Sequence, residues 1–202
     1  MKVLLGTKNK HKIIEMTRII KERNVDLEIL SLNDFEDMPE PIEDGTSFSE
    51  NAIIKAKYYY DIFKIPTITD DSGISARALN GEPGIYSARY ASTTDENSTD
   101  LDNRLKLLKN LANCDDRYVY YTCAIAFYDG TNTYTKEGYT DGMLLEEEIG
   151  TNGFGYDCIF YSLELNKPLG IATDEEKDTI SHRAKALNKL MDLFESQIST
   201  KM

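Results

Sequence analysis

Hydrophobic and polar positions along this chain recur with the two periods that distinguish helices from strands. Between residues 10 and 23 the apolar positions, among them Met16, Ile19 and Ile20, fall at helical spacing, and this predicts a helix with one buried face. A short apolar run before it predicts a buried strand over residues 2–6. A strand, a polar turn and a helix therefore open the chain.

The same patterns divide the rest of the chain into further elements. We expect strands at residues 27–32, 67–70, 74–79, 118–128 and 132–145, and helices at residues 48–63, 98–111 and 181–197. Ser47 and Glu50 have capping-box spacing, and Asp129-Gly130 predicts a hairpin between the two longest strands. No repeat or linker separates these elements. We therefore expect one α/β domain over residues 1–202, with a long mixed central sheet flanked by helices.

Composition narrows the possible classes of function. The 202 residues carry a net charge of −12, which argues against general nucleic-acid binding because duplex binding needs a basic face. The three cysteines, Cys114, Cys123 and Cys158, show no CxxC spacing. We therefore expect reduced thiols in a cytoplasmic protein, with no disulfide framework or structural zinc. We also expect neither a membrane span nor a signal peptide.

The turn between the first strand and the first helix is a candidate phosphate-binding loop. It contains Thr7, Lys8, Asn9, Lys10, His11 and Lys12. A helix N-terminus presents backbone N–H groups and the positive end of the helix dipole, which suits an anion. The GxxxxGK[ST] pattern of a Walker loop is absent. The alternative interpretation is an ordinary turn with a helix cap and solvated lysines.

Adjacent carboxylates mark a candidate catalytic and metal centre. Asp70 and Asp71 precede Ser72 and Gly73 at the end of an expected strand. Such carboxylates can hold Mg²⁺ and orient a water, and strand alternation directs only one of the two into a given site. The alternative interpretation is a plain turn, because Asp, Ser and Gly are the usual turn residues.

Three upstream residues could complete this centre. Glu43 lies in an acidic loop, Glu50 near the start of the helix at 48–63, and Lys55 five residues later on the same helix. The two carboxylates would extend an oxygen ligand set for a metal. Glu50 could instead serve only its helix cap, and Lys55 could be a surface lysine.

An aromatic turn and the start of the last expected helix suggest a pocket for a flat heterocycle. The turn is Gly153, Phe154, Gly155, Tyr156 and Asp157, and the helix start is Ser181, His182 and Arg183. Aromatic rings stack on bases, and glycines allow a close approach of the backbone. Alternatively, Phe154 and Tyr156 are core residues, His182 is a polar residue of a first helical turn, and Arg183 pairs with an acid.

These segments together resemble one known family. The matching segments are Thr7-x-Asn9-x-x-Lys12, Glu43-Asp44-Gly45, Phe48-Ser49-Glu50-Asn51-Ala52-x-x-Lys55-Ala56, Asp70-Asp71-Ser72-Gly73, Gly84-Ile85-Tyr86-Ser87-Ala88-Arg89, Gly153-Phe154-Gly155-Tyr156-Asp157 and Ser181-His182-Arg183. In this order, across nearly the whole chain, they resemble the inosine triphosphate pyrophosphatase family, also called Ham1-like.

The resemblance carries specific expectations about fold and activity. It implies an elongated mixed sheet flanked by helices, an active cleft between two lobes, and a homodimer. It also implies Mg²⁺-dependent cleavage of ITP, dITP and XTP to the monophosphate and pyrophosphate. Substrates would be small nucleotides, with no nucleic acid or membrane partner.

The resemblance also implies roles for individual residues. The segment from Thr7 to Lys12, with Lys55, would bind the phosphates, and Ser72 would contact the substrate. Asp71 would be the general base, with Glu43, Asp70 and Glu50 as further metal-side carboxylates. Phe154, Gly155, Tyr156, Asp157, Lys177, His182 and Arg183 would form the base site.

The chain departs from the family pattern at two positions, Cys158 where a proline is common and Lys8 where a glycine is common. Neither change removes a proposed functional group. Two other hypotheses remain open from the residues alone. One is a pyrophosphatase for other modified nucleotides, such as dUTP or methylated pyrimidine nucleotides, and the other is a nucleotide-binding module without turnover.

Overall fold

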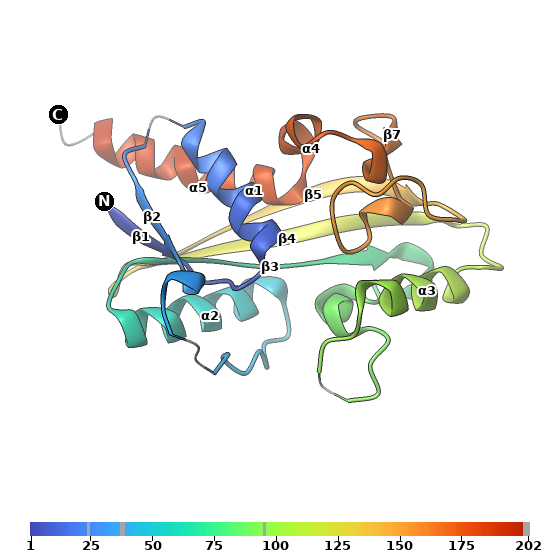
Figure 1. Cartoon of the computed structure of the whole chain (residues 1–202), viewed down its shortest axis with the longest axis horizontal. Coiled ribbons are helices and arrows are strands. Elements are labelled where there is room, and N and C mark those ends of the chain that lie inside the picture. The colour runs from blue at the N-terminus through green and yellow to red at the C-terminus, as the bar shows by residue number, and fades with distance from the viewer. Residues whose placement is uncertain (24, 37–38, 95, 200–202) are drawn as a thin grey trace. The chain divides into compact units, whose positions relative to one another are not determined.

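The computed structural model describes residues 1–23, 25–36, 39–94 and 96–199, which form a mixed α/β fold (Figure 1). The strands are β1 (Lys2–Leu5), β2 (Glu28–Ser31), β3 (Thr67–Ala76), β4 (Tyr118–Tyr128), β5 (Thr133–Leu144), β6 (Phe160–Ser162) and β7 (Lys167–Pro168). The α-helices are α1 (Lys10–Lys21), α2 (Phe48–Phe63), α3 (Asp100–Asn110), α4 (Asp174–Ile180) and α5 (His182–Ser199).

The strands belong to one seven-stranded sheet in the order β2-β1-β3-β4-β5-β6-β7. β1 is parallel to both of its neighbours, with Val3 opposite Ile29 of β2 and Leu5 opposite Ile68 of β3. β6 pairs antiparallel with both β5 and β7. The predicted mixed sheet flanked by helices is therefore confirmed, and α1 and α2 supply the crossovers that the parallel pairs require.

The chain forms two compact units and passes between them several times. Unit 1 comprises residues 1–71, residues 123–138 and the residues from Arg183 onward, whereas unit 2 comprises residues 72–122 and 139–182. β3, β4 and β5 each contribute residues to both units. Neither unit is therefore a continuous stretch of sequence.

Unit 1 buries apolar side chains on both faces of its strands. Successive residues of β1 point to opposite faces. Val3 and Leu5 pack in the cluster that contains the apolar sides of α1 and α5, while Leu4 packs with Tyr59 of α2. Figure 1 accordingly shows α1 and α5 on one side of these strands and α2 on the other. Polar residues at the ends of these elements can then meet on either face.

Unit 2 has its own apolar core. Tyr121 of β4 and Phe160 of β6 are buried in it. Leu107 of α3, Ile180 of α4 and Tyr156, which lies in the aromatic turn, belong to the same core. The ring centroids of Tyr121 and Phe160 lie 4.6 Å apart. This core supports the turn that carries the candidate base-binding residues.

The sequence prediction was wrong about the Asp-rich segment. We expected strands at 67–70 and 74–79 separated by a turn, but β3 runs through the whole segment and ends at Ala76. Gly73 serves close packing within the strand, because a Cβ there would lie 2.3 Å from Oγ of Ser87. The interpretation of this segment as a plain turn is therefore wrong as well.

Other elements agree more closely with the sequence. The helix at 48–63 and the strand at 118–128 have the predicted bounds, and β4 and β5 are neighbours in the sheet. We did not predict α4, β6 or β7, which are too short to show a clear period. In the described parts of the chain, no helix has the length and apolar character that a bilayer crossing requires.

Candidate active site

β3 carries Asp70 and Asp71 next to each other, and strand geometry sends them to opposite faces of unit 1. Oδ2 of Asp70 is 2.9 Å from Nζ of Lys12 in α1. Oδ1 of Asp71 is 2.9 Å from Nζ of Lys55 in α2. The expectation that the two carboxylates point to different sides is confirmed.

Lys55 lies between two carboxylates. Its Nζ is 2.8 Å from Oε2 of Glu43 and 2.9 Å from Oδ1 of Asp71, and Lys55 is 9% exposed. Asn51, one helical turn earlier in α2, donates from Nδ2 to Oδ2 of Asp71 at 3.3 Å and accepts the backbone N–H of Gly45 at 2.9 Å. The interpretation of Lys55 as a surface lysine is therefore wrong.

Burial and charge act against each other in this cluster. Burial raises the pKa of Asp71, with Glu43 adding to the rise, while the charges of Lys55 and Lys12 oppose it. Burial alone would lower the pKa of Lys55, but Asp71 and Glu43 raise it above its usual value. Lys55 is thus held protonated beside a carboxyl group with an increased affinity for a proton.

Asp70 belongs to a second buried network, which it shares with Arg183 of α5. The guanidinium lies 3.1 Å from Oδ2 of Asp70 and donates from Nη1 to Oε2 of Glu15 in α1 at 2.6 Å. Arg183 is 1% exposed. Burial would raise the pKa of Asp70, but Lys12, Arg183 and Lys55 hold it well below its usual range. The interpretation of Arg183 as the partner of an acid is confirmed.

The turn before α1 is a capped helix start. Oδ1 of Asn9 accepts the backbone N–H groups of His11 at 3.0 Å and Lys12 at 3.2 Å, and Oγ1 of Thr7 accepts that of Asn9 at 3.2 Å. The helix cap in the alternative interpretation is thus present. Lys10 and His11 are exposed, so their charged or polar side chains face solvent at this end of unit 1.

Glu50 has local partners. Its Oε2 accepts the backbone N–H of Thr46 at 2.6 Å and the hydroxyl of the same residue at 2.8 Å, while its own N–H donates to Oγ of Ser47. These bonds lower the pKa of Glu50. The contacts fix the start of α2, as the capping interpretation requires.

In unit 2, the carboxylate of Asp157 organises the aromatic turn. Its Oδ2 accepts the backbone N–H of Phe154 at 2.9 Å and Nζ of Lys177 at 2.7 Å, and its Oδ1 accepts the hydroxyl of Tyr121 at 3.2 Å. A Cβ at Gly153, where φ is +76°, would lie 2.1 Å from Oδ2. The turn therefore needs glycine for both its conformation and its packing.

The two aromatic residues of the turn have different environments. Tyr156 is 6% exposed in the core, and its hydroxyl donates to the backbone oxygen of Ser87 at 2.7 Å. Phe154 is half-buried, and Nζ of Lys177 lies 4.7 Å from its ring centroid. The core interpretation is confirmed for Tyr156, whereas the ring of Phe154 remains partly exposed.

His182 and Gly155 complete the predicted set in unit 2. His182 is the first residue of α5 and is 5% exposed, and its ring stacks on Tyr121 with centroids 4.5 Å apart. Gly155 donates its N–H to Oδ2 of Asp100 at 2.9 Å, and its carbonyl accepts Nη1 of Arg104 at 2.8 Å. Unit 2 thus brings Phe154, Asp157, Lys177 and His182 together. Tyr121 links the two segments, because it contacts both Asp157 and His182.

Comparison with known proteins identifies the family. The family model described as the Ham1 family matches residues 3–193. The chain belongs to the Ham1 family. It is 44% identical to a dITP/XTP pyrophosphatase of Desulfotalea psychrophila, over 93% of this chain and 82% of the relative. It is 40% identical to a protein of the same name from Geobacillus kaustophilus, over 98% and 97% of the two chains.

Solved structures of the Ham1 family have the same fold. The Ham1 protein of Staphylococcus aureus superposes with a TM-score of 0.85 at 35% identity, over 98% of this chain and 100% of its own. A Ham1 protein from Coxiella burnetii gives 0.86 at 32% identity, over 97% and 99%. The fold that the resemblance implied is therefore confirmed.

Few acidic side chains of this Ham1 chain lie close enough together to share a metal ion. Among the described residues, no three His, Cys, Asp or Glu side chains form a group that could hold an ion. Glu43 and Asp71 nevertheless converge on one cation, the ammonium of Lys55, and they are oxygen ligands of the kind that Mg²⁺ prefers. Asp70, by contrast, pairs with Lys12 and Arg183, and Glu50 accepts from Thr46 at the start of α2.

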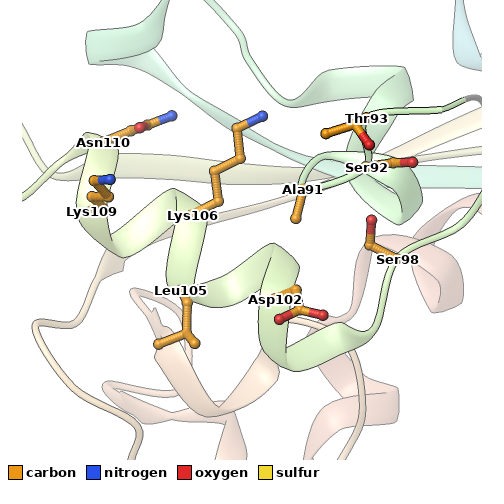
Figure 2. A pocket seen from close by; sticks show the side chains of 9 residues that line it. All are labelled: Ala91, Ser92, Thr93, Ser98, Asp102, Leu105, Lys106, Lys109 and Asn110. Atoms are coloured by element: carbon orange, nitrogen blue, oxygen red, sulfur yellow. The ribbon is translucent and has the colours of Figure 1, made fainter.

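A hollow of about 530 Å³ lies beside α3 in unit 2 of this Ham1 chain (Figure 2). Its lining residues are Ala91, Ser92, Thr93, Ser98, Asp102, Leu105, Lys106, Lys109 and Asn110. None of them was a predicted site residue. Nζ of Lys106 donates to the backbone oxygen of Tyr90 at 2.5 Å, and Asn110 donates to the hydroxyl of Tyr90 at 2.8 Å. These polar groups hold the preceding loop against α3.

The residues that contact the predicted site but were absent from the predicted set include Glu15, Asn51 and Tyr121. Asn51 lies four residues before Lys55 on one helix, so a shared helix face was a usable signal. Glu15 is one of 35 acidic residues, and Tyr121 lies within the β-prone run at 118–128. Nothing in the sequence distinguishes these two from structural residues.

Proposed function

We propose that this protein hydrolyses non-standard purine nucleoside triphosphates, namely ITP, dITP and XTP, to the nucleoside monophosphate and pyrophosphate. The observation that carries the proposal is the buried cluster in which Asp71 and Glu43 share the ammonium of Lys55. The relatives named dITP/XTP pyrophosphatase supply the substrate class. Such an activity would remove these nucleotides before they enter DNA or RNA.

The residues of unit 1 would act on the phosphates. Asp71 accepts a proton from the attacking water at a carboxylate oxygen, and the water oxygen forms a bond to the α-phosphorus. The bond from that phosphorus to the oxygen bridging to the β-phosphate breaks, and pyrophosphate leaves with the electron pair. Lys12 and Lys55 bring positive charge to the phosphates, and Thr7 and Asn9 add polar contacts. Positioning and electrostatics would supply most of the rate acceleration.

Magnesium is part of the proposal as a cofactor. Held by Glu43 and Asp71, Mg²⁺ would neutralise charge on the phosphates and on the leaving pyrophosphate. We further propose that the protein acts as a homodimer in the cytoplasm, as the family resemblance implies.

The residues of unit 2 would bind the base. Phe154 offers a half-buried ring backed by the ammonium of Lys177. Hypoxanthine and xanthine carry a 6-keto oxygen where adenine carries an amine. Backbone N–H donors near His182 would bind that oxygen and reject the amine, since a mismatched buried polar group is costly.

Replacing Phe154 with leucine should weaken nucleotide binding without slowing the chemical step. Because stacking on one base is worth about 1–3 kcal/mol, we expect KM for ITP to rise about 5- to 100-fold with kcat little changed. Steady-state kinetics measures both values. Phe35→Leu is a matched control, because Phe35 is also half-buried and its ring packs, tilted, against that of Phe63 in unit 1. Equal KM values for the two variants would show that Phe154 does not stack on the base.

The function is tested by a substrate panel. The purified protein is incubated with Mg²⁺ and ITP, dITP, XTP, ATP, GTP or dUTP, with and without a chelator, and the products are separated by chromatography. We expect monophosphate and pyrophosphate from ITP, dITP and XTP, little turnover of ATP and GTP, and no turnover with the chelator.

Other outcomes of the panel would point elsewhere. Diphosphate and phosphate would contradict attack at the α-phosphorus. Turnover of dUTP alone would indicate a different modified-nucleotide pyrophosphatase, and binding without turnover would indicate a nucleotide-binding module.

A further inference from the structure

Tyr121 of β4 connects the two segments of unit 2 that carry the candidate base-binding residues. Its hydroxyl donates to Oδ1 of Asp157, in the aromatic turn, at 3.2 Å. Its ring stacks on the imidazole of His182, at the start of α5, with centroids 4.5 Å apart and planes 8° from parallel. One side chain therefore touches both segments.

The ring of Tyr121 is held firmly in place. It packs between His182 and Phe160, whose ring centroid is 4.6 Å away, and the residue is 6% exposed. A ring fixed by the core on one side gives the imidazole a defined plane on the other. The orientation of His182 therefore depends on a residue that faces the interior.

The hydroxyl of Tyr121 donates to a different oxygen of Asp157 from the other two donors. Oδ2 accepts the backbone N–H of Phe154 and the ammonium of Lys177, whereas Oδ1 accepts the hydroxyl. Burial raises the pKa of Tyr121 well above its usual value, and the charge of Asp157 adds to the rise. The hydroxyl thus remains a donor at neutral pH and fixes the rotation of the carboxylate.

The rotation of Asp157 affects the face on which a base would stack. The ammonium of Lys177 is 2.7 Å from Oδ2 of Asp157 and 4.7 Å from the ring centroid of Phe154. If the carboxylate turns, the lysine and the backbone of Phe154 lose their common anchor. A change at Tyr121 would therefore reach Phe154 through two hydrogen bonds.

We propose that Tyr121 is a positioning residue for base recognition, which orients Asp157 through its hydroxyl and His182 through its ring without touching the nucleotide. The proposal rests on the function proposed above and adds to it a residue that sets base affinity. Since the hydroxyl acts on the base end of the substrate, its loss should change KM rather than kcat.

The test compares Tyr121→Phe with Tyr118→Phe in the full-length protein. Tyr118 lies on the same strand, and its hydroxyl donates to Oδ1 of Asp141 at 2.5 Å, so the control also removes one hydrogen bond from a tyrosine to a carboxylate. For Tyr121→Phe we expect KM for ITP to rise about three- to tenfold, with kcat unchanged. Inhibition by inorganic tripolyphosphate, which has no base, should not change. Tyr118→Phe should match the wild type in each measurement.

Each other outcome has a defined meaning. If wild-type protein hydrolyses ITP but Tyr121→Phe has an unchanged KM, the role of Tyr121 is wrong and the function stands. A parallel loss of ITP affinity and tripolyphosphate inhibition would indicate general disruption and would also overturn the role. If the wild type neither binds nor hydrolyses ITP, the proposed function fails, and the role of Tyr121 fails with it.

Discussion

Replacing Asp71 with asparagine should lower kcat for ITP by about 10²- to 10⁴-fold, the usual contribution of a general base. Asparagine keeps the shape of the side chain and one oxygen near Lys55, but it cannot take a proton from water. Burial already raises the pKa of Asp71, so the carboxylate is a better proton acceptor than an exposed one. Steady-state kinetics under saturating Mg²⁺ measures the loss.

The same variant should still bind nucleotide, because Lys12, Lys55 and the base site are unchanged. Calorimetry with a non-hydrolysable triphosphate analogue tests this. Asp61→Asn is the matched control, since Asp61 is exposed and pairs with Lys64, which is also exposed. A near-wild-type rate for Asp71→Asn would show that Asp71 is not the general base. Full recovery of its rate at high Mg²⁺ concentration would instead assign Asp71 to metal binding alone.

Replacing Arg183 with methionine should cost about 3–5 kcal/mol of the free energy of unfolding. Arg183 is 1% exposed and pairs with both Glu15 and Asp70. Methionine fills similar space but leaves two buried carboxylates without their guanidinium. Since domains are stable by only about 5–15 kcal/mol, this loss should be evident in a urea unfolding curve.

Arg77→Met is the matched control for this prediction. The side chain of Arg77 is 64% exposed and pairs with Asp116, so its loss should leave the urea midpoint close to that of the wild type. Equal midpoints for the two variants would contradict the structural role of Arg183. If Arg183→Met kept its stability but lost affinity for ITP, the guanidinium would belong to the base site, as the family resemblance implied.

The elements with a strong period could be predicted from the sequence. The helix at 48–63 and the strand at 118–128 each have a clear pattern over more than ten residues, and the structure has the same bounds. The segment at Asp70 failed because polar residues interrupt its apolar pattern. Strand propensity could not reveal that β3 continues through two carboxylates, which find cationic partners on α1 and α2.

The residues of the candidate site could be selected from the sequence, but their different environments could not. Phe154 and Tyr156 look alike in the sequence, yet only the structure separates a half-buried ring from a core residue. Asp70 and Arg183 looked like functional groups of separate motifs, and they form one ion pair across 113 positions of sequence. Such a distance leaves no local pattern from which the pairing can be read.

The interrupted course of unit 1 has a consequence for how the protein is made. The cluster that buries Met16 and Ile19 of α1 is completed by Leu187 and Leu190 of α5, which are synthesised long after α1. The apolar face of α1 therefore stays incompletely covered during synthesis until α5 has been made. Nonsense mutations that stop synthesis before α5 should therefore yield fragments that aggregate, because this apolar face finds no partner.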